Sequence, residues 1–315
     1  MQQLNHKIVR LAVMMTIASL GCGSYDAYAA SEAKKPQVKA NQALSMAELI
    51  KQSKAQDWRA LDPENTLVME LEKGQVVIEL APHFAPQSIA NIKALVHENY
   101  FDGLAMIRSH DNYVAQWGDA DEKRAIKNAR DKLPAEFSVH ADKADVFTRL
   151  PDADGYAPQV GHVNGFAVGR DPKTQQTWLT HCYGAVGVAR GNEIDSGNGT
   201  SLYAIIGHAP RHLDRNVTVV GRVMQGIALL SSLPRGAGAM GFYEKAEERG
   251  AIKSVRLASD MPEAERPRLE VVRTESLLFK DIVAAQRNRG GEWYKHAANY
   301  IELCNVPIPV RAREP

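Results

Sequence analysis

The central part of the chain opens with apolar residues spaced two apart. Leu67, Met69 and Leu71 occupy alternate positions, and the same spacing resumes over 76–80 after Glu72-Lys73-Gly74. Side chains of a strand alternate between its two faces, so this spacing predicts two strands joined by a tight, glycine-containing turn. We expect a β-hairpin here.

Four segments have the 3.6-residue spacing of amphipathic helices. Pro86 opens one of them, because proline is favoured in a first helical turn, and positions 89, 92, 95 and 96 share one apolar face. Ser45 followed by Glu48 forms a capping box before another. The sequence therefore predicts helices over 46–60, from Pro86 to just before Asn99, and over 224–233 and 276–287.

Short strand-like runs with many glycines fill most of the chain beyond Gly103. They cover 186–188, 202–206, 217–223 and 252–257, and turn-rich sequence separates them. Parallel strands would each need a crossover helix, and too few helical segments lie among these runs to supply them. The pattern is typical of a mainly β protein with an antiparallel barrel or sandwich.

The first thirty residues have the order of a secretory signal peptide. Lys7 and Arg10 precede an apolar run over 11–21, and Ala27-Tyr28-Ala29 supplies an A-x-A cleavage site. The apolar run would extend only about 16 Å as a helix, so we expect no stable membrane span. Cleavage of residues 1–29 predicts a periplasmic or secreted protein.

A lipoprotein signal is the alternative for the same segment. Ser19-Leu20-Gly21-Cys22 places a cysteine after the apolar run, and acylation would anchor the protein to a membrane through Cys22. The leucine lies one position nearer the cysteine than in typical lipoprotein signals, so we favour cleavage after Ala29. Residues 30–63 then form a tether followed by the N-terminal helix.

The composition is that of a globular protein without a charge bias. The 315 residues are 44% hydrophobic and 24% charged, and 38 Lys and Arg balance 37 Asp and Glu. Nucleic-acid binding would need a basic surface, so we expect no nucleic-acid partner. Three cysteines cannot form a disulfide-dense scaffold, so hydrophobic packing must hold the fold together.

Export would leave two cysteines, Cys182 and Cys304. An even number in a disulfide-permissive compartment predicts a bridge that pins the C-terminal tail, although each could equally be a small buried hydrophobe. The helices predicted near the two ends carry apolar faces that need covering. We expect them to pack on the central β region or on each other, with a dimer interface as the alternative.

The stretch with the most chemistry is residues 100–119, YFDGLAMIRSHDNYVAQWGD. It resembles the cyclophilins, peptidyl-prolyl cis–trans isomerases whose signature has the form F-H-R-x-x-x-x-F-x-x-Q-G-G-D. Three further segments resemble the family in the same order. Residues 85–95 resemble its first helix, 184–203 the pattern G-x-x-S-M-A…N-G-S-Q-F-F, and 212–223 the pattern W-L-D…V-F-G-K-V.

The resemblance covers residues 64–260 and leaves a helical extension and tail over 261–315. An insertion over about 124–182 interrupts it where the family has a much shorter loop. The centre of the insertion is rich in Gly, Pro and Asp, and we expect it on the surface near the site. The family's fold implies a closed antiparallel eight-stranded barrel capped by two helices, to which helical N- and C-terminal extensions are added.

The resemblance also implies the site. Arg108 falls on the catalytic arginine, and Gln116 on the glutamine that orients it. The implied substrate-binding residues are Tyr113, Val114, Ala189, Arg190, Leu202, Tyr203, His212 and Leu213. Proline-containing polypeptides, such as unfolded or exported proteins, are the expected partners.

Rotation about an X–Pro bond explains these residue types. The barrier of about 18–20 kcal/mol arises from amide resonance, and no bond to the substrate has to form or break. The reaction therefore needs no nucleophile, metal or cofactor, and we expect none; the catalyst must bind the twisted amide better than the planar forms. A fixed guanidinium, here Arg108, can donate a hydrogen bond to the proline nitrogen, which gains a lone pair in the twisted state.

Several positions depart from the family pattern. Ile107 and Val217 replace histidines, Arg190 replaces an asparagine, Ser201 a glutamine and His212 a tryptophan. These changes predict slower or differently selective isomerisation. They keep a second function open, that of a peptide-binding module or chaperone with little or no turnover.

Other motifs are weaker. His208 and His212 are four apart, but Pro210 lies between them and no carboxylate-rich partner follows, so we predict no metal site. Ser109-His110-Asp111 are adjacent and cannot face one another as the members of a hydrolase triad do. Gly236-Ala237-Gly238 lacks the lysine and the strand-to-helix context of a phosphate-binding loop.

Overall fold

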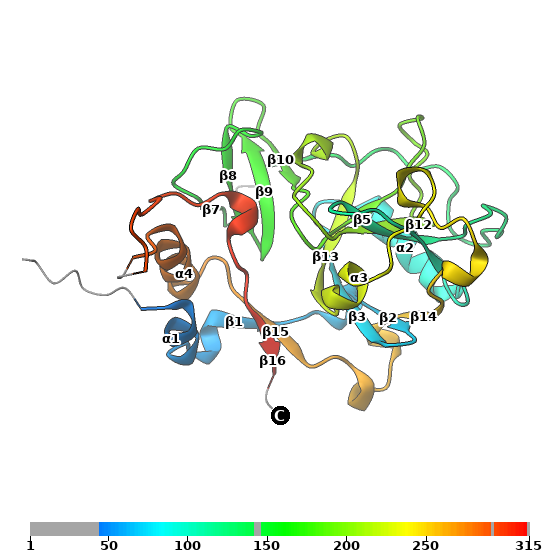
Figure 1. The fold of residues 1–315 in the computed structure, drawn as a ribbon, viewed down its shortest axis with the longest axis horizontal. Coiled ribbons are helices and arrows are strands. Elements are labelled where there is room, and N and C mark those ends of the chain that lie inside the picture. Colours follow the sequence, from blue (N-terminus) through cyan, green and yellow to red (C-terminus); the bar gives the residue numbers. More distant parts are fainter. Residues whose placement is uncertain (1–43, 142–145, 291–292, 314–315) are drawn as a thin grey trace, which may run out of the picture. The chain divides into compact units, whose positions relative to one another are not determined.

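The computed structural model describes residues 44–141, 146–290 and 293–313, so the predicted signal peptide and most of the tether lie outside the described residues. Three antiparallel sheets and four α-helices form the described part of the chain (Figure 1). The helices are α1 (Met46–Lys51), α2 (Pro86–His97), α3 (Ile227–Ser231) and α4 (Leu277–Arg287).

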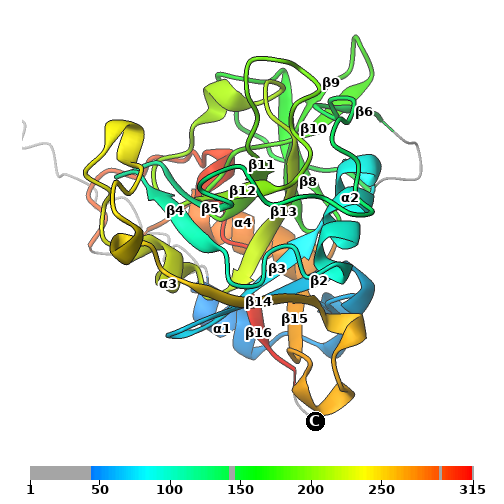
Figure 2. The ribbon, with the colours of Figure 1, turned by 90° about the vertical axis from the view of Figure 1, so that its right-hand side faces the viewer.

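The largest sheet is an eight-stranded antiparallel barrel that is nearly closed, as predicted. Its strand order is β14 (Ile252–Leu257), β2 (Thr66–Leu71), β3 (Gly74–Leu80), β13 (Val219–Gln225), β11 (Ala185–Val188), β12 (Ser201–Ile205), β5 (Val114–Gly118) and β4 (Ala105–Ser109). Figure 2 shows β14, β2 and β3 side by side. The two edge strands meet through backbone hydrogen bonds of 2.8 Å, from Met106 to Gly250 and from Ile252 to Leu104.

The barrel core is the cluster of buried side chains inside this sheet and under its helices. Trp117, Met106 and Phe101 are among its largest members, and each is at most 1% exposed. The buried face of α2 contributes Ile89, Ile92, Leu95 and Val96, and α3 contributes Leu230. The predicted hairpin is present as β2 and β3, paired from Thr66–Glu79 to Leu71–Gly74.

A small third sheet covers the outer face of this hairpin. It consists of β1 (Trp58–Ala60), β15 (Leu269–Val272) and β16 (Val310–Ala312). Val77, on the outer face of β3, is 1% exposed and packs with Leu61, Met224 and Val271. The hairpin is therefore buried on both faces, because segments from both ends of the chain pair across it.

The insertion folds into a five-stranded sheet. Its strand order is β6 (Val139–His140), β10 (Gln176–Leu179), β9 (Phe166–Asp171), β8 (Gln159–Val163) and β7 (Thr148–Arg149). Trp178, Val160 and Leu150 of the insertion are buried with α4 residues Phe279 and Ile282. This cluster, which we call the second core, also includes Trp58 and tail residues, and side chains of α1 pack against it.

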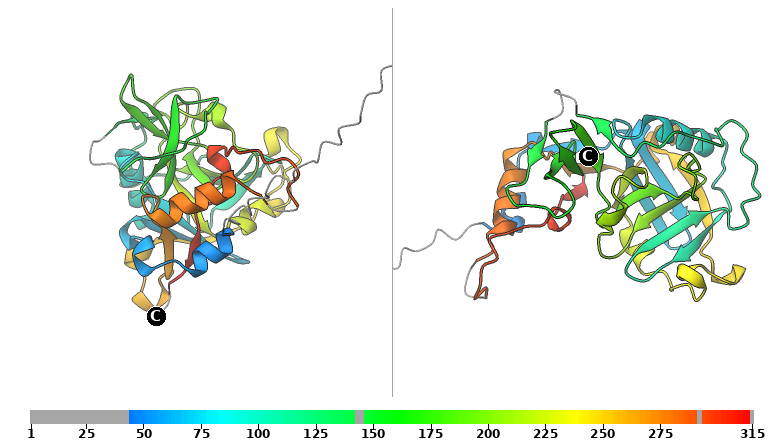
Figure 3. Two further views of the ribbon diagram at one scale, coloured as in Figure 1. Left: turned by 90° about the vertical axis from the view of Figure 1, so that its left-hand side faces the viewer. Right: turned by 90° about the horizontal axis from the view of Figure 1, so that it is seen from above.

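The two terminal helices pack on each other, as the sequence predicts. Met46, Leu49 and Ile50 of α1 lie against the same cluster as the buried face of α4, and both views of Figure 3 show the helices side by side. Leu277 is an exception to the predicted apolar face of α4, because it is 75% exposed.

The N-terminal helix is much shorter than predicted. The expected helix over 46–60 ends at Lys51, and Trp58 lies instead in β1, paired with Val272. Ser53 explains the end of the helix, since its hydroxyl donates to the Ile50 carbonyl at 2.6 Å and accepts from the Trp58 indole at 3.0 Å. Pairing with Val272, far along the chain, overrides the local helical spacing.

The predicted helix over 224–233 is also shorter. Strand β13 continues to Gln225, and Gly226 then takes a left-handed conformation with φ of 85° before α3 begins at Ile227. A Cβ at this position would lie 2.3 Å from the Gln75 carbonyl oxygen. Glycine is therefore required where strand changes to helix.

A disulfide joins Cys182, at the end of the insertion, to Cys304 in the tail, with their Cα atoms 5.0 Å apart. It links residues 122 positions apart, as the cysteine count predicts. Within the described ranges, the helices are all too short or too polar to cross a membrane.

Candidate active site

Arg108 and Gln116 face each other across the hairpin of β4 and β5. A bulge in β4 lies between Met106, which pairs with Trp117 in the barrel core, and Arg108, which pairs with Gln116. The bulge turns the arginine away from the core, so its side chain lines a groove on the barrel. Both Arg108 and Gln116 are only 8% exposed.

Each nitrogen of the Arg108 guanidinium has one partner in the protein. Nε donates to the Met240 carbonyl at 2.6 Å, Nη1 to Gln116 Oε1 at 3.3 Å, and Nη2 to His110 Nδ1 at 3.2 Å. The guanidinium also lies over two aromatic rings, at 5.5 Å from the centre of Tyr113 and 5.1 Å from that of Phe242. One N–H on each terminal nitrogen remains for a ligand, because guanidinium has five such donors.

The charged guanidinium of Arg108 lies in a partly buried environment. Burial lowers the pKa of its guanidinium below the usual value, and the neighbouring Tyr113 opposes the shift. Arginine nevertheless stays protonated in proteins. The groove therefore presents a fixed cation with donors, beside apolar walls, which strengthens its hydrogen bonds relative to water.

Gln116 is itself anchored. Its Nε2 donates to Ser201 Oγ at 3.0 Å, and Ser201 Oγ donates to the Trp117 carbonyl at 3.2 Å. Ser201, which departs from the family pattern, thus fixes which end of the amide faces Arg108. The Gln116 oxygen accepts from the arginine, and its nitrogen points to β12.

The walls of the groove enclose a cavity of about 420 Å³. Of the residues implied by the family resemblance, the structure brings together Arg108, Tyr113, Val114, Gln116, Ala189, Arg190, Tyr203 and Leu213. Apolar side chains face the guanidinium across this cavity. The arrangement suits a small apolar ring placed against a hydrogen-bond donor.

Two implied substrate-binding residues lie elsewhere. Leu202 is 2% exposed and belongs to the barrel core, because successive side chains of β12 alternate and Tyr203 is the one that faces the groove. His212 is exposed in a short 3-10 turn, and its side chain does not line the groove. Its position in the motif is kept, but the turn directs Leu213 to the cavity instead.

Arg190 lines the groove from an exposed loop. Its Nε donates to the Asn216 carbonyl at 3.0 Å, and Nη1 donates to the Gly191 carbonyl at 2.8 Å. These bonds hold the Arg190 side chain between its own loop and the segment at Asn216. The family has an asparagine at this position.

Sequence reasoning missed the loop that covers Arg108. Met240 has φ of 55°, unusual for a residue other than glycine, and this turn aims its carbonyl at Arg108. Phe242 from the same loop bridges to Arg108 through the backbone and lies over its guanidinium. The glycine-rich sequence around 236–241 was the available signal, and it marks this covering loop.

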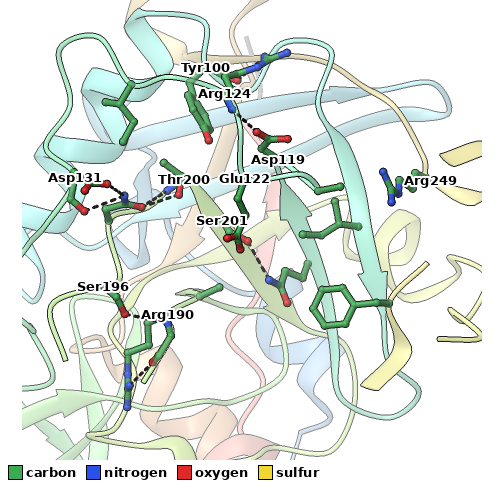
Figure 4. A pocket seen from close by; sticks show the side chains of 18 of the residues that line it. Tyr100, Asp119, Glu122, Arg124, Asp131, Arg190, Ser196, Thr200, Ser201 and Arg249 are labelled. Carbon is green, nitrogen blue, oxygen red and sulfur yellow. Dashed lines mark hydrogen bonds between the residues drawn. The ribbon is translucent and has the colours of Figure 1, made fainter. Parts of the chain in front are cut away.

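A second cavity of about 750 Å³ adjoins the groove and shares Gln116, Ala189, Arg190, Gly191 and Phe242 with it. Its lining mixes charges of both signs, and Figure 4 shows Asp119 and Arg124 near Tyr100, apart from Arg190 and Ser196. Although burial opposes it, backbone donors from Arg124, Asp121 and Lys123 lower the pKa of Asp119. The surroundings of the groove are therefore polar and nearly balanced in charge.

No group of three or more His, Cys, Asp or Glu side chains is placed to hold a metal ion in the ranges that the structure covers. The chemistry of the groove comes from an arginine, an amide and apolar walls.

Comparison with known proteins identifies relatives of this arrangement. Residues 66–257 match the model of the cyclophilin type peptidyl-prolyl cis-trans isomerase family. A Brucella suis protein named as a peptidyl-prolyl cis-trans isomerase is 28% identical over 206 residues, covering 62% of this chain and 80% of that protein. A Synechocystis protein named as a thylakoid lumen peptidyl-prolyl cis-trans isomerase is 25% identical over 184 residues, covering 54% of this chain and 44% of that protein.

Among solved structures, cyclophilin AquaCyp293 from Hirschia baltica is similar over 82% of this chain and 95% of that chain. The TM-score is 0.66 and the sequence identity is 26%. The similarity covers a longer stretch than residues 66–257 alone.

Proposed function

The chain belongs to the cyclophilin-type peptidyl-prolyl cis-trans isomerase family, and from this premise we propose that it isomerises X–Pro bonds of exported polypeptides by an arginine-assisted rotation in the groove at Arg108. The enzyme class follows from the family, whereas the mechanism and the cellular setting are our proposals. The observation that carries the mechanism is the buried Arg108 guanidinium, fixed by three partners at the edge of an apolar cavity.

In the proposed mechanism the proline ring lies among Tyr113, Val114, Tyr203 and Leu213. Rotation breaks the amide resonance and makes the proline nitrogen pyramidal, so the nitrogen gains a lone pair that is absent from both planar forms. A free N–H of Arg108 donates to this lone pair, and Gln116 and Met240 hold the guanidinium in place. Stabilisation appears only in the twisted state, which is the condition for acceleration.

We expect the residues that flank the proline to extend over the neighbouring cavity of about 750 Å³. Its balanced charges favour no single charge type at these positions. Broad acceptance of sequences around the proline suits a protein that acts on many unfolded chains.

Three observations support action outside the cytoplasm. The first thirty residues have the order of a signal peptide, and a disulfide joins Cys182 to Cys304. Disulfides persist in oxidising compartments. The Synechocystis relative is named for the thylakoid lumen. Mass spectrometry of the mature protein distinguishes an N-terminus at Ala30 from an acylated Cys22.

The mechanism is tested by Arg108→Ala and Arg108→Lys in a proline-peptide isomerisation assay. Loss of one preorganised donor lowers kcat by about 10²–10³, and lysine restores little because its ammonium lacks the planar fork. Peptide affinity falls much less, because the apolar walls supply ground-state binding.

Arg256→Ala is the matched control. Arg256 lies on β14, forms an ion pair with Asp102 at 2.7 Å and does not line the groove. We expect the isomerisation rate of this variant to match that of the wild type. An Arg108→Ala rate within threefold of wild type contradicts the mechanism. Equal inactivity of wild type and Arg108→Ala, with peptide binding intact, would instead identify a peptide-binding module.

A further inference from the structure

Tyr203 brings a hydroxyl into a buried position. Residues 198–203 read NGTSLY where the cyclophilin pattern has N-G-S-Q-F-F, so an aromatic ring without a hydroxyl is usual at this place. Tyr203 is 7% exposed, and its ring lines the groove. A buried hydroxyl needs a hydrogen-bond partner, and burial raises the pKa of this one well above its usual value, which keeps it a donor.

His181 is that partner. Its Nε2 lies 2.9 Å from the Tyr203 hydroxyl, and its Nδ1 lies 2.9 Å from Asp214 Oδ1. A carboxylate only accepts, so Nδ1 carries a proton, and in the neutral form of the ring Nε2 then accepts from the tyrosine. His181 is fully buried, and its backbone N–H also donates to Asp214 Oδ1 at 2.9 Å.

The hydrogen bonds continue from His181, at the end of the insertion, through Asp214 and Arg211 to the centre of the insertion. Arg211 Nε donates to Asp214 Oδ2 at 2.5 Å, and its two terminal nitrogens donate to the Asp154 carboxylate at 3.0 and 3.1 Å. The side chains of Arg211, Asp214 and Asp154 are each at most 6% exposed. Although burial opposes the charge, Asp214 and Asp154 raise the pKa of Arg211, so a fixed cation joins the two carboxylates.

Gly187 leaves room for the Tyr203 side chain because it has no Cβ. It pairs with Tyr203 across β11 and β12, and a Cβ on Gly187 would lie 2.3 Å from the tyrosine hydroxyl oxygen. The His181 ring is stacked with the Tyr203 ring at an interplanar angle of 12°. The Tyr203 hydroxyl therefore lies between the backbone of Gly187 and the imidazole of His181.

We propose that His181 is a positioning residue of the isomerase, which holds Tyr203 as a wall of the proline pocket, and that Asp154 connects the centre of the insertion to this wall. The inference rests on the proposed function. Without His181, the hydroxyl loses its buried partner and the ring turns toward the solvent of the groove, where it occupies the space of the proline. The centre of the insertion then affects turnover although it does not line the groove.

A double-mutant cycle tests this proposal. His181→Phe is compared with its parent in two backgrounds, wild type and Tyr203→Phe, by kcat, KM and the Kd for a proline peptide. In the wild-type background we expect kcat/KM to fall about tenfold, a size typical of coupling between residues in contact. The change should appear mainly in KM, because the displaced ring weakens binding of the proline. In the Tyr203→Phe background His181→Phe lowers kcat/KM by less than twofold, because no hydroxyl remains to be held.

A milder variant and a control complete the experiment. Asp154→Asn, at the far end of the chain of hydrogen bonds, gives a smaller loss of about threefold that also disappears in the Tyr203→Phe background. His162→Phe is the matched control, since His162 is as buried as His181 but takes no part in these hydrogen bonds. We expect this substitution to leave kcat/KM unchanged. Melting temperatures accompany every variant.

Equal losses in both backgrounds, or a change in melting temperature without a change in KM or Kd, overturn the proposal and leave a structural role only. If His181→Phe does not fold, Asp154→Asn decides by the same comparison. If the wild type proves inactive, the same double-mutant cycle is measured by the Kd for the proline peptide. Failure of the isomerase mechanism and failure of the positioning role therefore remain distinguishable.

Discussion

The barrel core and the second core differ in where their residues come from along the chain. The barrel core draws on the strands and helices of residues 67–257, in which neighbouring strands are often neighbours in sequence. The second core combines Trp58, parts of the insertion, α4 and the tail around Val306. The comparison shows that a barrel of the common family pattern can carry a second, separately assembled hydrophobic core.

The two cores also meet the groove differently. Strands of the barrel carry Arg108, Gln116 and Tyr203 directly, whereas the residues of the second core do not line the groove. Damage to the second core should therefore lower stability more than turnover. Three measurements test this separation.

The largest effect is expected from Phe279→Ala. The ring is fully buried in the second core, against His162 at 4.9 Å between ring centres. Removing such a ring lowers the free energy of unfolding by about 3–5 kcal/mol through lost burial and a cavity. Chemical denaturation measures this loss, and kcat/KM of the folded variant should stay within about twofold of wild type because Phe279 does not line the groove.

Leu277→Ala is the matched control for this substitution. Leu277 begins the same helix but is 75% exposed, so the free energy of unfolding should change by less than about 0.5 kcal/mol. A kcat/KM of Phe279→Ala as low as that of Arg108→Ala would show that the two cores are not separable in function.

The next effect comes from the disulfide. Cys304→Ser releases the tail from the end of the insertion and frees the unfolded chain from a closed loop of 122 residues. The free energy of unfolding should fall by about 2–4 kcal/mol, as for other native bridges. Reduction of the wild type should reproduce the loss, and the variant should not respond to reductant; equal stability of oxidised and reduced wild type would contradict this.

At mildly acidic pH, a smaller effect is expected from His162 of β8. Its side chain is fully buried, and neither ring nitrogen has a hydrogen-bond partner in the described part of the chain. Burial and the nearby charge of Arg222 lower its pKa to about 3. The unfolded chain has the ordinary value of about 6.5, so the folded state excludes a proton that the unfolded state binds below that pH.

The sign of the effect follows. The stability from neutral His162 is fully present above pH 6.5 and is lost as the pH falls toward 3, by about 1.4 kcal/mol per pH unit. Denaturation at several pH values between 4 and 7 measures the slope, and His162→Phe should remove this part of it. An unchanged slope in the variant would show that His162 is not the group that titrates.

Much of the barrel and of the groove could be predicted from local sequence. The alternation at β2 and β3, the proline that opens α2, and the strand over 252–257 are each specified within a dozen residues, because the pleat and the helical turn impose short periods. The resemblance to the cyclophilins identified Arg108 and Gln116, and their local spacing agrees with it. Their spacing of eight places them opposite each other across one hairpin, so local pairing brings them together.

The tertiary structure alone decided the rest, because the deciding contacts join residues far apart in sequence. Trp58 leaves the predicted helix for a strand beside Val272, and the Met240 carbonyl reaches Arg108 from a loop 132 residues away. Leu202 turns to the core because pairing with Trp117 sets its face. The spacing of apolar residues indicates which side chains share a face of a helix or strand. Which element packs against that face depends on the packing of the whole chain.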